Sequence, residues 1–180
     1  MKKLSHLTML LVASLALPSF ALAQGSSDDL IQIVRNATKK YQNVANTAPD
    51  YGPAFGCVSG PDHGAMGVHY VNGNIVHGET LLPNGQLDPT KPQALIYEPQ
   101  LNGDMKLVGV EFIVDEATWG KKNSAPPQLY QQLLQLIPSP NRYGLDTFYE
   151  LHVWAWQDNP NGAFVDWNNK VSCNLQGTTL

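Results

Sequence analysis

Residues 148–156 combine polar and aromatic side chains at a spacing that could support chemistry. Successive side chains of an extended strand point to opposite faces, so every second residue shares a face. One face would carry Tyr149, Leu151, Val153 and Ala155. The other would carry Glu150 and His152 together with three aromatic residues, Phe148, Trp154 and Trp156. A carboxylate beside an imidazole can hold a metal ion or move a proton, and we therefore expect the functional site on this second face.

A second stretch, residues 107–114, brings another carboxylate to the predicted site. Its alternation places Glu111 with Leu107, Gly109 and Ile113, opposite an apolar face made of Val108, Val110, Phe112 and Val114. If the two strands share a sheet, Glu111 falls on the same face as Glu150 and His152. Gly109 would leave space there for a ligand or for another side chain. By the same argument, His69 in the stretch 66–71 can join the group.

The four residues His69, Glu111, Glu150 and His152 predict a transition-metal site. Two neutral imidazoles with one or two carboxylates form a suitable ligand set for Zn²⁺, Cu²⁺, Fe²⁺ or Mn²⁺. The sequence contains no compact motif such as His-Glu-x-x-His, so folding would have to assemble the site from separate strands. Two alternatives stay open: Glu150 and His152 form a hydrogen-bonded pair in a partly buried aromatic surface, or they act as acid and base.

The aromatic residues indicate two further functions. Trp154 and Trp156, on the predicted face of Glu150, could stack on a carbohydrate or another small ligand. The protein would then be an enzyme, with Glu150 or Glu111 as general base and His152 as its partner. Alternatively, it is a metal-free binding or assembly protein whose aromatic face meets another subunit.

The spacing His63-x-x-Met66-x-x-His69 is a second possible metal motif. It mixes imidazole with thioether, a combination that copper in an oxidising compartment can use. A structural interpretation competes with it, because Met66 also suits a gap in the core and His63 suits an exposed turn.

The first 23 residues have the three parts of a secretory signal peptide. Lys2 and Lys3 form a basic start, residues 4–17 are largely apolar, and the small residues up to Ala23 predict cleavage before Gln24. We therefore expect a periplasmic or secreted protein with residues 24–180 as one globular domain. The apolar run is too short for a good membrane span, and no later stretch reaches the roughly 20 apolar residues that a span needs.

Charge and cysteine content agree with export. Removal of the two lysines in the predicted signal peptide changes the formal net charge from −4 to −6, which disfavours nucleic acid and anionic membranes as partners. A metal ion or a small ligand is the expected partner, and the oligomeric state stays open. Cys57 and Cys173 are the two cysteines of the chain, and we expect them to form one disulfide between the start and the end of the fold.

The remaining patterns predict an α+β fold, with a mostly antiparallel sheet of about four to five strands and two helices. An amphipathic helix is expected over residues 27–46, with a capping box at Ser26 and Asp29. Strands are expected over residues 66–71, 94–98, 107–114 and 148–156, with a short fifth over 163–167 that returns as a hairpin. The leucine spacing after Pro127 predicts a second, short helix that ends before Pro138.

Three stretches carry a resemblance to other proteins: GAMGVHYVN at 64–72, LIYEP at 95–99 and YELHVWAWQDNP at 149–160. With them, the chain resembles an uncharacterised family of small exported bacterial proteins. The likeness covers most of the chain after the predicted cleavage site. It implies kinship and export, and it assigns no activity to any residue.

Overall fold

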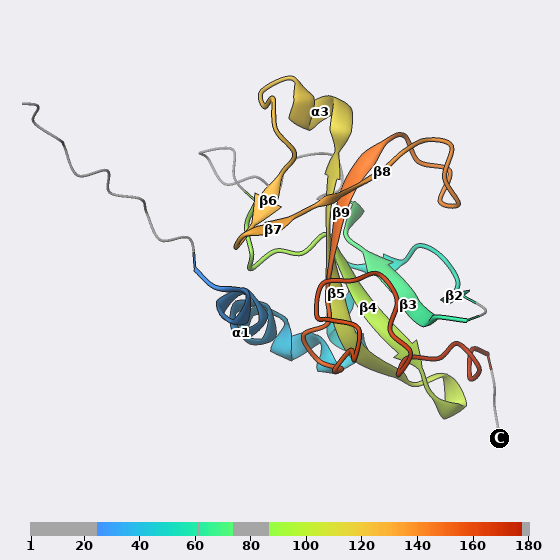
Figure 1. Ribbon diagram of the computed structural model, residues 1–180. Helices are drawn as coiled ribbons and strands as arrows, with labels where there is room; N and C mark the ends of the chain where they lie inside the picture. Colours follow the sequence, from blue (N-terminus) through green and yellow to red (C-terminus); the bar gives the residue numbers. More distant parts are fainter. Residues whose placement is uncertain (1–24, 61, 74–86, 178–180) are drawn as a thin grey trace, which may run out of the picture.

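A seven-stranded antiparallel sheet forms the centre of the fold (Figure 1). The computed structural model describes residues 25–60, 62–73 and 87–177. The strands run in the order β1, β3, β4, β5, β9, β8, and β2 pairs with β3 outside this order. Their bounds are Gly52–Pro53 (β1), Val58–Gly60 (β2), Gly64–Val71 (β3), Ala94–Pro99 (β4), Met105–Asp115 (β5), Gln135–Ile137 (β8) and Phe148–Val153 (β9). The predicted α+β class is confirmed, and the four long strands are those that the sequence predicts.

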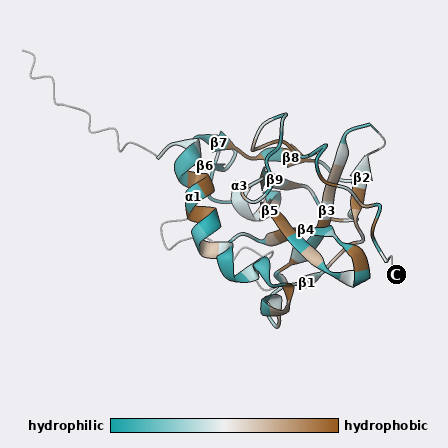
Figure 2. Cartoon of the chain, turned by 90° about the horizontal axis from the view of Figure 1, so that it is seen from below, coloured by the Kyte–Doolittle hydropathy of each residue, from teal (hydrophilic) through white to brown (hydrophobic). Residues whose placement is uncertain are grey.

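The N-terminal helix is also confirmed, although it is shorter than predicted. Helix α1 spans Ser27–Thr38 and begins with the predicted capping box, in which Ser26 and Asp29 bind each other's backbone N–H groups. Two 3₁₀ turns follow, η1 (Lys39–Gln42) and η2 (Val44–Thr47). Hydrophilic and hydrophobic residues alternate along α1 (Figure 2), and Leu30 and Val34 bury its apolar side against the sheet.

The second helix does not lie where the leucine spacing predicts it. Residues 128–137 form the small hairpin of β6 (Gln128–Leu129) and β7 (Gln132–Leu133), followed by strand β8. Tyr130 and Gln131 have positive φ angles of 48° and 67°, which end a helix but suit a tight turn. Among the residues that the structure describes, a short helix is found instead at α3, Glu116–Gly120, which directly follows β5.

The predicted hairpin after β9 was wrong as well. The turn is present, because the N–H of Gly162 donates to the carbonyl of Asn159 at 3.1 Å, but residues 163–167 form no strand. The returning chain meets the residue just after β9 through a single bond, from the N–H of Trp154 to the carbonyl of Ala163. Strand β9 ends at Val153, three residues earlier than predicted.

The two faces of the sheet bury different cores. On the helix side, one large cluster joins α1 to the sheet; its members include Leu30, Val34, Leu95, Tyr97, Val110, Phe112, Leu151 and Val153. The opposite face carries two small clusters, one with Ile96, Val108 and Trp154 and the other with Ala94, Ile113 and Phe148. Along β5 and β9, the predicted site residues fall between these two small clusters.

The predicted face of Val108 was wrong, because β5 contains a β-bulge at this residue. Ile96 pairs with Gly109 and Tyr97 pairs with Leu107, so Val108 is an extra residue in β5. The bulge turns Leu107 toward the helix side and Val108 toward the opposite face. The alternation C-terminal to the bulge follows the prediction.

The space beside Gly109 is filled by the protein itself. A Cβ atom at Gly109 would lie 2.9 Å from the carbonyl oxygen of Val153 and 3.4 Å from the indole ring of Trp154. The glycine therefore permits the close approach of β9 and the packing of Trp154.

The predicted disulfide is confirmed. Cys57 and Cys173 are joined with a Cα–Cα distance of 5.6 Å, across 116 residues of sequence. This bond is consistent with export to an oxidising compartment. Residues 1–23, the predicted signal peptide, lie outside the described residues. Within the described part of the chain, no helix has the length and apolar character needed to cross a membrane.

Gly67 in β3 is expected to tolerate no side chain. Its φ is +99°, and a Cβ atom there would lie 2.6 Å from the carbonyl oxygen of Tyr97 on β4. We expect Gly67→Ala to lower the free energy of unfolding by about 1–3 kcal/mol in urea denaturation. Gly52→Ala is the matched control, because no heavy atom outside its neighbours lies within 4 Å of its Cβ position. Equal losses in both variants would contradict this account of Gly67.

Candidate metal centre

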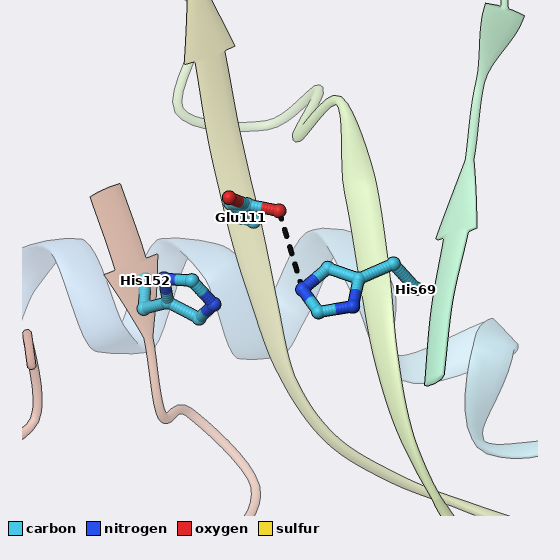
Figure 3. Close-up of side chains that lie close together, drawn as sticks. All are labelled: His69, Glu111 and His152. Carbon is cyan, nitrogen blue, oxygen red and sulfur yellow. Dashed lines mark ion pairs between the residues drawn. The ribbon is translucent and has the colours of Figure 1, made fainter. Parts of the chain in front are cut away.

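Three strands bring the four predicted ligands to one place on the sheet. Glu111 on β5 and His152 on β9 are direct cross-strand partners, and Glu150 follows on the same face of β9. His69 lies on β3, and its imidazole extends over β4 to the Glu111 carboxylate. Figure 3 shows the two imidazoles on either side of Glu111. Folding thus assembles residues that are far apart in the sequence.

The distances within this group are those of a compact cluster. Nε2 of His69 lies 3.4 Å from Oε2 of Glu111, and the two imidazole centroids are 5.8 Å apart with their planes at 88°. One ligand atom from each of His69, Glu111 and His152 lies within 4.8 Å of the others. The three residues are 3%, 4% and 0% exposed, respectively. We call them the inner ligand group.

Several buried polar atoms of the site have no hydrogen-bond partner within the described residues. They are both ring nitrogens of His152 and Oε2 of Glu150, whereas His69 makes a hydrogen bond to the backbone of Gly67. Leaving a buried polar atom unpaired costs about 1–3 kcal/mol, and native proteins rarely do so. A cation would offset this cost because it accepts lone pairs from imidazole and carboxylate groups.

Burial keeps both imidazoles in the form that binds metal. It lowers the pKa of His69 to about 4. It also lowers the pKa of His152 to about 3, and the neighbouring His69 adds to this shift. Both rings are therefore neutral at pH 7, and each has one nitrogen with a free lone pair.

The pKa values of the carboxyl groups of the site are shifted upward, in the opposite direction to those of the imidazoles. Burial raises the pKa of Glu150 to about 7. Burial also raises the pKa of Glu111 well above its usual value, and the nearby Glu150 raises it further. Two carboxyl groups in this position hold a proton near neutral pH, which a bound cation would displace.

Asp166 belongs to the site, although its sequence context did not single it out. Its Oδ1 lies 3.7 Å from Nδ1 of His152. Glu150, His152 and Asp166 form a second group with ligand atoms within 4.8 Å of one another, which we call the outer ligand group. Asp166 comes from the irregular segment after β9, where no strand alternation predicts the direction of a side chain. The only signal was the density of Asp and Asn residues in that segment.

The structure does not bring the His63, Met66 and His69 motif together as one ligand set. His63 is exposed, whereas Met66 and His69 are buried in β3. The thioether of Met66 accepts a hydrogen bond of 3.4 Å from the hydroxyl of Tyr143. Met66 therefore serves the core of this face, and only His69 belongs to the inner ligand group.

Trp154 and Trp156 lie on different faces, contrary to the predicted alternation, because β9 ends before them. The indole N–H of Trp156 donates to the hydroxyl of Thr38 in α1 at 3.0 Å. The indole N–H of Trp154 donates to the carbonyl of Val165 on the opposite side at 2.6 Å. Trp154 is also buried, with 3% exposure. The two indoles form no shared cleft, and Trp154 offers no exposed surface to another subunit.

Comparison of the chain with protein-family models, with curated proteins and with solved structures gives no match. The functional argument therefore rests on the geometry of the two ligand groups.

Proposed function

We propose that the protein binds a transition-metal ion through His69, His152 and Glu111. The observation that carries the proposal is the buried cluster of two neutral imidazoles and the Glu111 carboxyl group, in which neither ring nitrogen of His152 has a hydrogen-bond partner among the described residues. A bound cation would use one nitrogen of each ring and would reduce the cost of burying them. Because the disulfide is consistent with export, the ion would be bound in an oxidising compartment.

An ordinary ion pair between His69 and Glu111 explains the geometry less well. Such a pair needs a protonated imidazole, and burial lowers the pKa of His69 to about 4. The distance of 3.4 Å between Nε2 and Oε2 is longer than the roughly 2.7–2.9 Å of charge-assisted hydrogen bonds. Two ligand atoms that are each about 2.1 Å from a tetrahedral ion lie roughly 3.4 Å apart, so this separation suits two ligands of one ion.

The ligand types narrow the choice of metal. Imidazole nitrogens combined with carboxylate oxygens suit Zn²⁺, Cu²⁺, Fe²⁺ and Mn²⁺, whereas Ca²⁺ and Mg²⁺ prefer oxygen ligands alone. Glu150 provides a further carboxylate beside Glu111. Zn²⁺ is the first ion to test, because three protein ligands with one open position form a common zinc site.

Calorimetric titration of the metal-free protein with Zn²⁺, Cu²⁺, Fe²⁺ and Mn²⁺ tests the proposal. We expect at least one of these ions to bind at one per chain, and His69→Gln to weaken its binding at least about tenfold. Asp104→Asn is the control, because Asp104 is exposed and belongs to neither ligand group. Failure of all four ions to bind, or equal affinities of wild type and His69→Gln, would contradict the proposal.

Metal affinity is expected to fall as the pH decreases from about 8 to about 6. Below its raised pKa of about 7, Glu150 holds a proton that the carboxyl pair must release when a cation binds. Each released proton weakens apparent binding by about tenfold per pH unit. The imidazoles do not contribute to the pH dependence of binding in this range, because their pKa values are about 4 and about 3.

Calorimetry in buffers of different ionisation enthalpy measures the protons released on binding, and it should detect about one proton per ion at pH 6. Proton release that occurs only below about pH 5 would contradict this prediction, because it would show that the imidazoles lose the protons and not the carboxyl pair.

A further inference from the structure

We propose that the outer ligand group, Glu150, His152 and Asp166, is a second metal position through which the ion passes to reach the inner ligand group. This inference rests on the proposed function, because both groups use His152. Nδ1 of His152 and Oε2 of Glu150 are buried and have no hydrogen-bond partner among the described residues, so both have lone pairs to offer. The outer ligand group is therefore more than a pair of neighbouring acidic residues.

A surface pocket reaches the outer ligand group at Asp166. The pocket has a volume of about 380 Å³ and is lined by His63, Gln135, Asn161, Val165, Asp166 and Trp167. Asp166 is shared by the pocket lining and the outer ligand group. Its side chain is 22% exposed, whereas that of His152, with Nδ1 3.7 Å from Oδ1 of Asp166, is fully buried. An ion that enters the pocket therefore meets Asp166 before it meets the imidazole.

The surroundings of the pocket hold the Asp166 carboxyl group in place, and burial raises its pKa. Gln135 of β8, which pairs with Glu150 of β9, makes a side-chain hydrogen bond to the Asp166 carboxylate. The exposed guanidinium of Arg142, which lies 5.3 Å from the ring centroid of Trp167, opposes this rise in the pKa of Asp166 only in part. A cation that binds between Glu150 and Asp166 would favour the ionised forms of both carboxyl groups, as any nearby positive charge does.

A neutral His152 can serve only one metal position at a time, because its ring has one nitrogen with a lone pair and one N–H group. In the outer position, Nδ1 would bind the ion and Nε2 would carry the proton. When the ion moves inward, Nε2 would lose its proton to water and bind the ion, while Nδ1 takes a proton from water. The new N–H can then donate to Asp166, and carboxylates commonly orient ligating histidines in this way.

The test compares the rates of ion uptake and release in wild type and Asp166→Asn by stopped-flow competition with a fluorescent chelator. The probe is the tightest-binding of the four titrated ions, with Zn²⁺ as first choice. Asparagine keeps an oxygen that can accept a hydrogen bond from Nδ1, but it loses the negative charge. We expect both rates to fall at least about tenfold, and by a larger factor than the dissociation constant changes, because the asparagine oxygen can still orient His152. Asp158→Asn, at an exposed aspartate of the same segment, should match wild type.

The possible outcomes separate this inference from the proposed function. Unchanged rates in Asp166→Asn would overturn the outer position and leave the inner ligand group intact. Loss of the ion in Asp166→Asn with retention in His69→Gln would locate the ion permanently at the outer ligand group, which overturns the passage and the proposed inner ligands. A wild-type protein that binds none of the four ions would overturn both proposals.

Discussion

Replacement of His152 by leucine is expected to abolish metal binding without lowering the stability of the metal-free protein. His152 belongs to both ligand groups, so the variant retains neither group complete. Leucine is close to histidine in size and would replace two buried, unpartnered nitrogens with apolar atoms. Such a replacement is neutral or stabilising when the polar atoms had no partner to lose.

Thermal unfolding with and without the ion measures both effects. An ion present at about 100 times its dissociation constant stabilises the wild type by about 2.7 kcal/mol. For a domain of this size, that gain raises the melting temperature by roughly 5–11 °C. His152→Leu should show no such rise, whereas the exposed control Asp104→Asn should behave like wild type. A metal-free His152→Leu protein that is about 1–3 kcal/mol less stable than wild type would indicate a structural hydrogen-bonded histidine instead.

Loss of the Cys57–Cys173 disulfide is expected to lower the free energy of unfolding by several kcal/mol. The bond closes a loop of 116 residues, and the chain-entropy model gives about 4–5 kcal/mol for a loop of that length. Cys173 also packs against the small cluster that contains Trp154 and Val108, next to the candidate site. We expect the double variant Cys57→Ala/Cys173→Ala to lose about 2–5 kcal/mol in denaturant unfolding.

Reduction of the wild-type protein under native conditions is the matched control for this variant. Both should lose the same free energy of unfolding, because both remove the cross-link from the unfolded chain. A loss below about 0.5 kcal/mol in the double variant would show that the cross-link contributes little.

The alternation of side chains identified most of the site because the central strands are buried on both faces. In such strands a shift of one residue would exchange the two faces, so the register is strictly determined. Glu111 and His152 therefore meet as cross-strand partners, and Glu150 follows two residues away in β9. The same reasoning located His69, although β4 lies between its strand and β5.

Local backbone features limited the rest of the prediction. The alternation failed for Val108 at a β-bulge and for Trp156 beyond the end of β9. The leucines after Pro127 suggested a helix, but Leu133 is 65% exposed and lies in a hairpin with a positive-φ turn. Asp166 was missed because an irregular segment places it. Bulges, strand ends and irregular segments depend on tertiary packing, and no periodic pattern reveals them.

The metal content of the protein tests the central claim most directly. The chain should be purified without chelators or a histidine tag, and its bound metals measured by elemental analysis. The account predicts close to one Zn, Cu, Fe or Mn ion per chain in the wild type and less than about a tenth of that in His152→Leu, which lacks a complete ligand group. A wild-type protein that contains none of these metals, and that stays empty after incubation with all four ions, would contradict it.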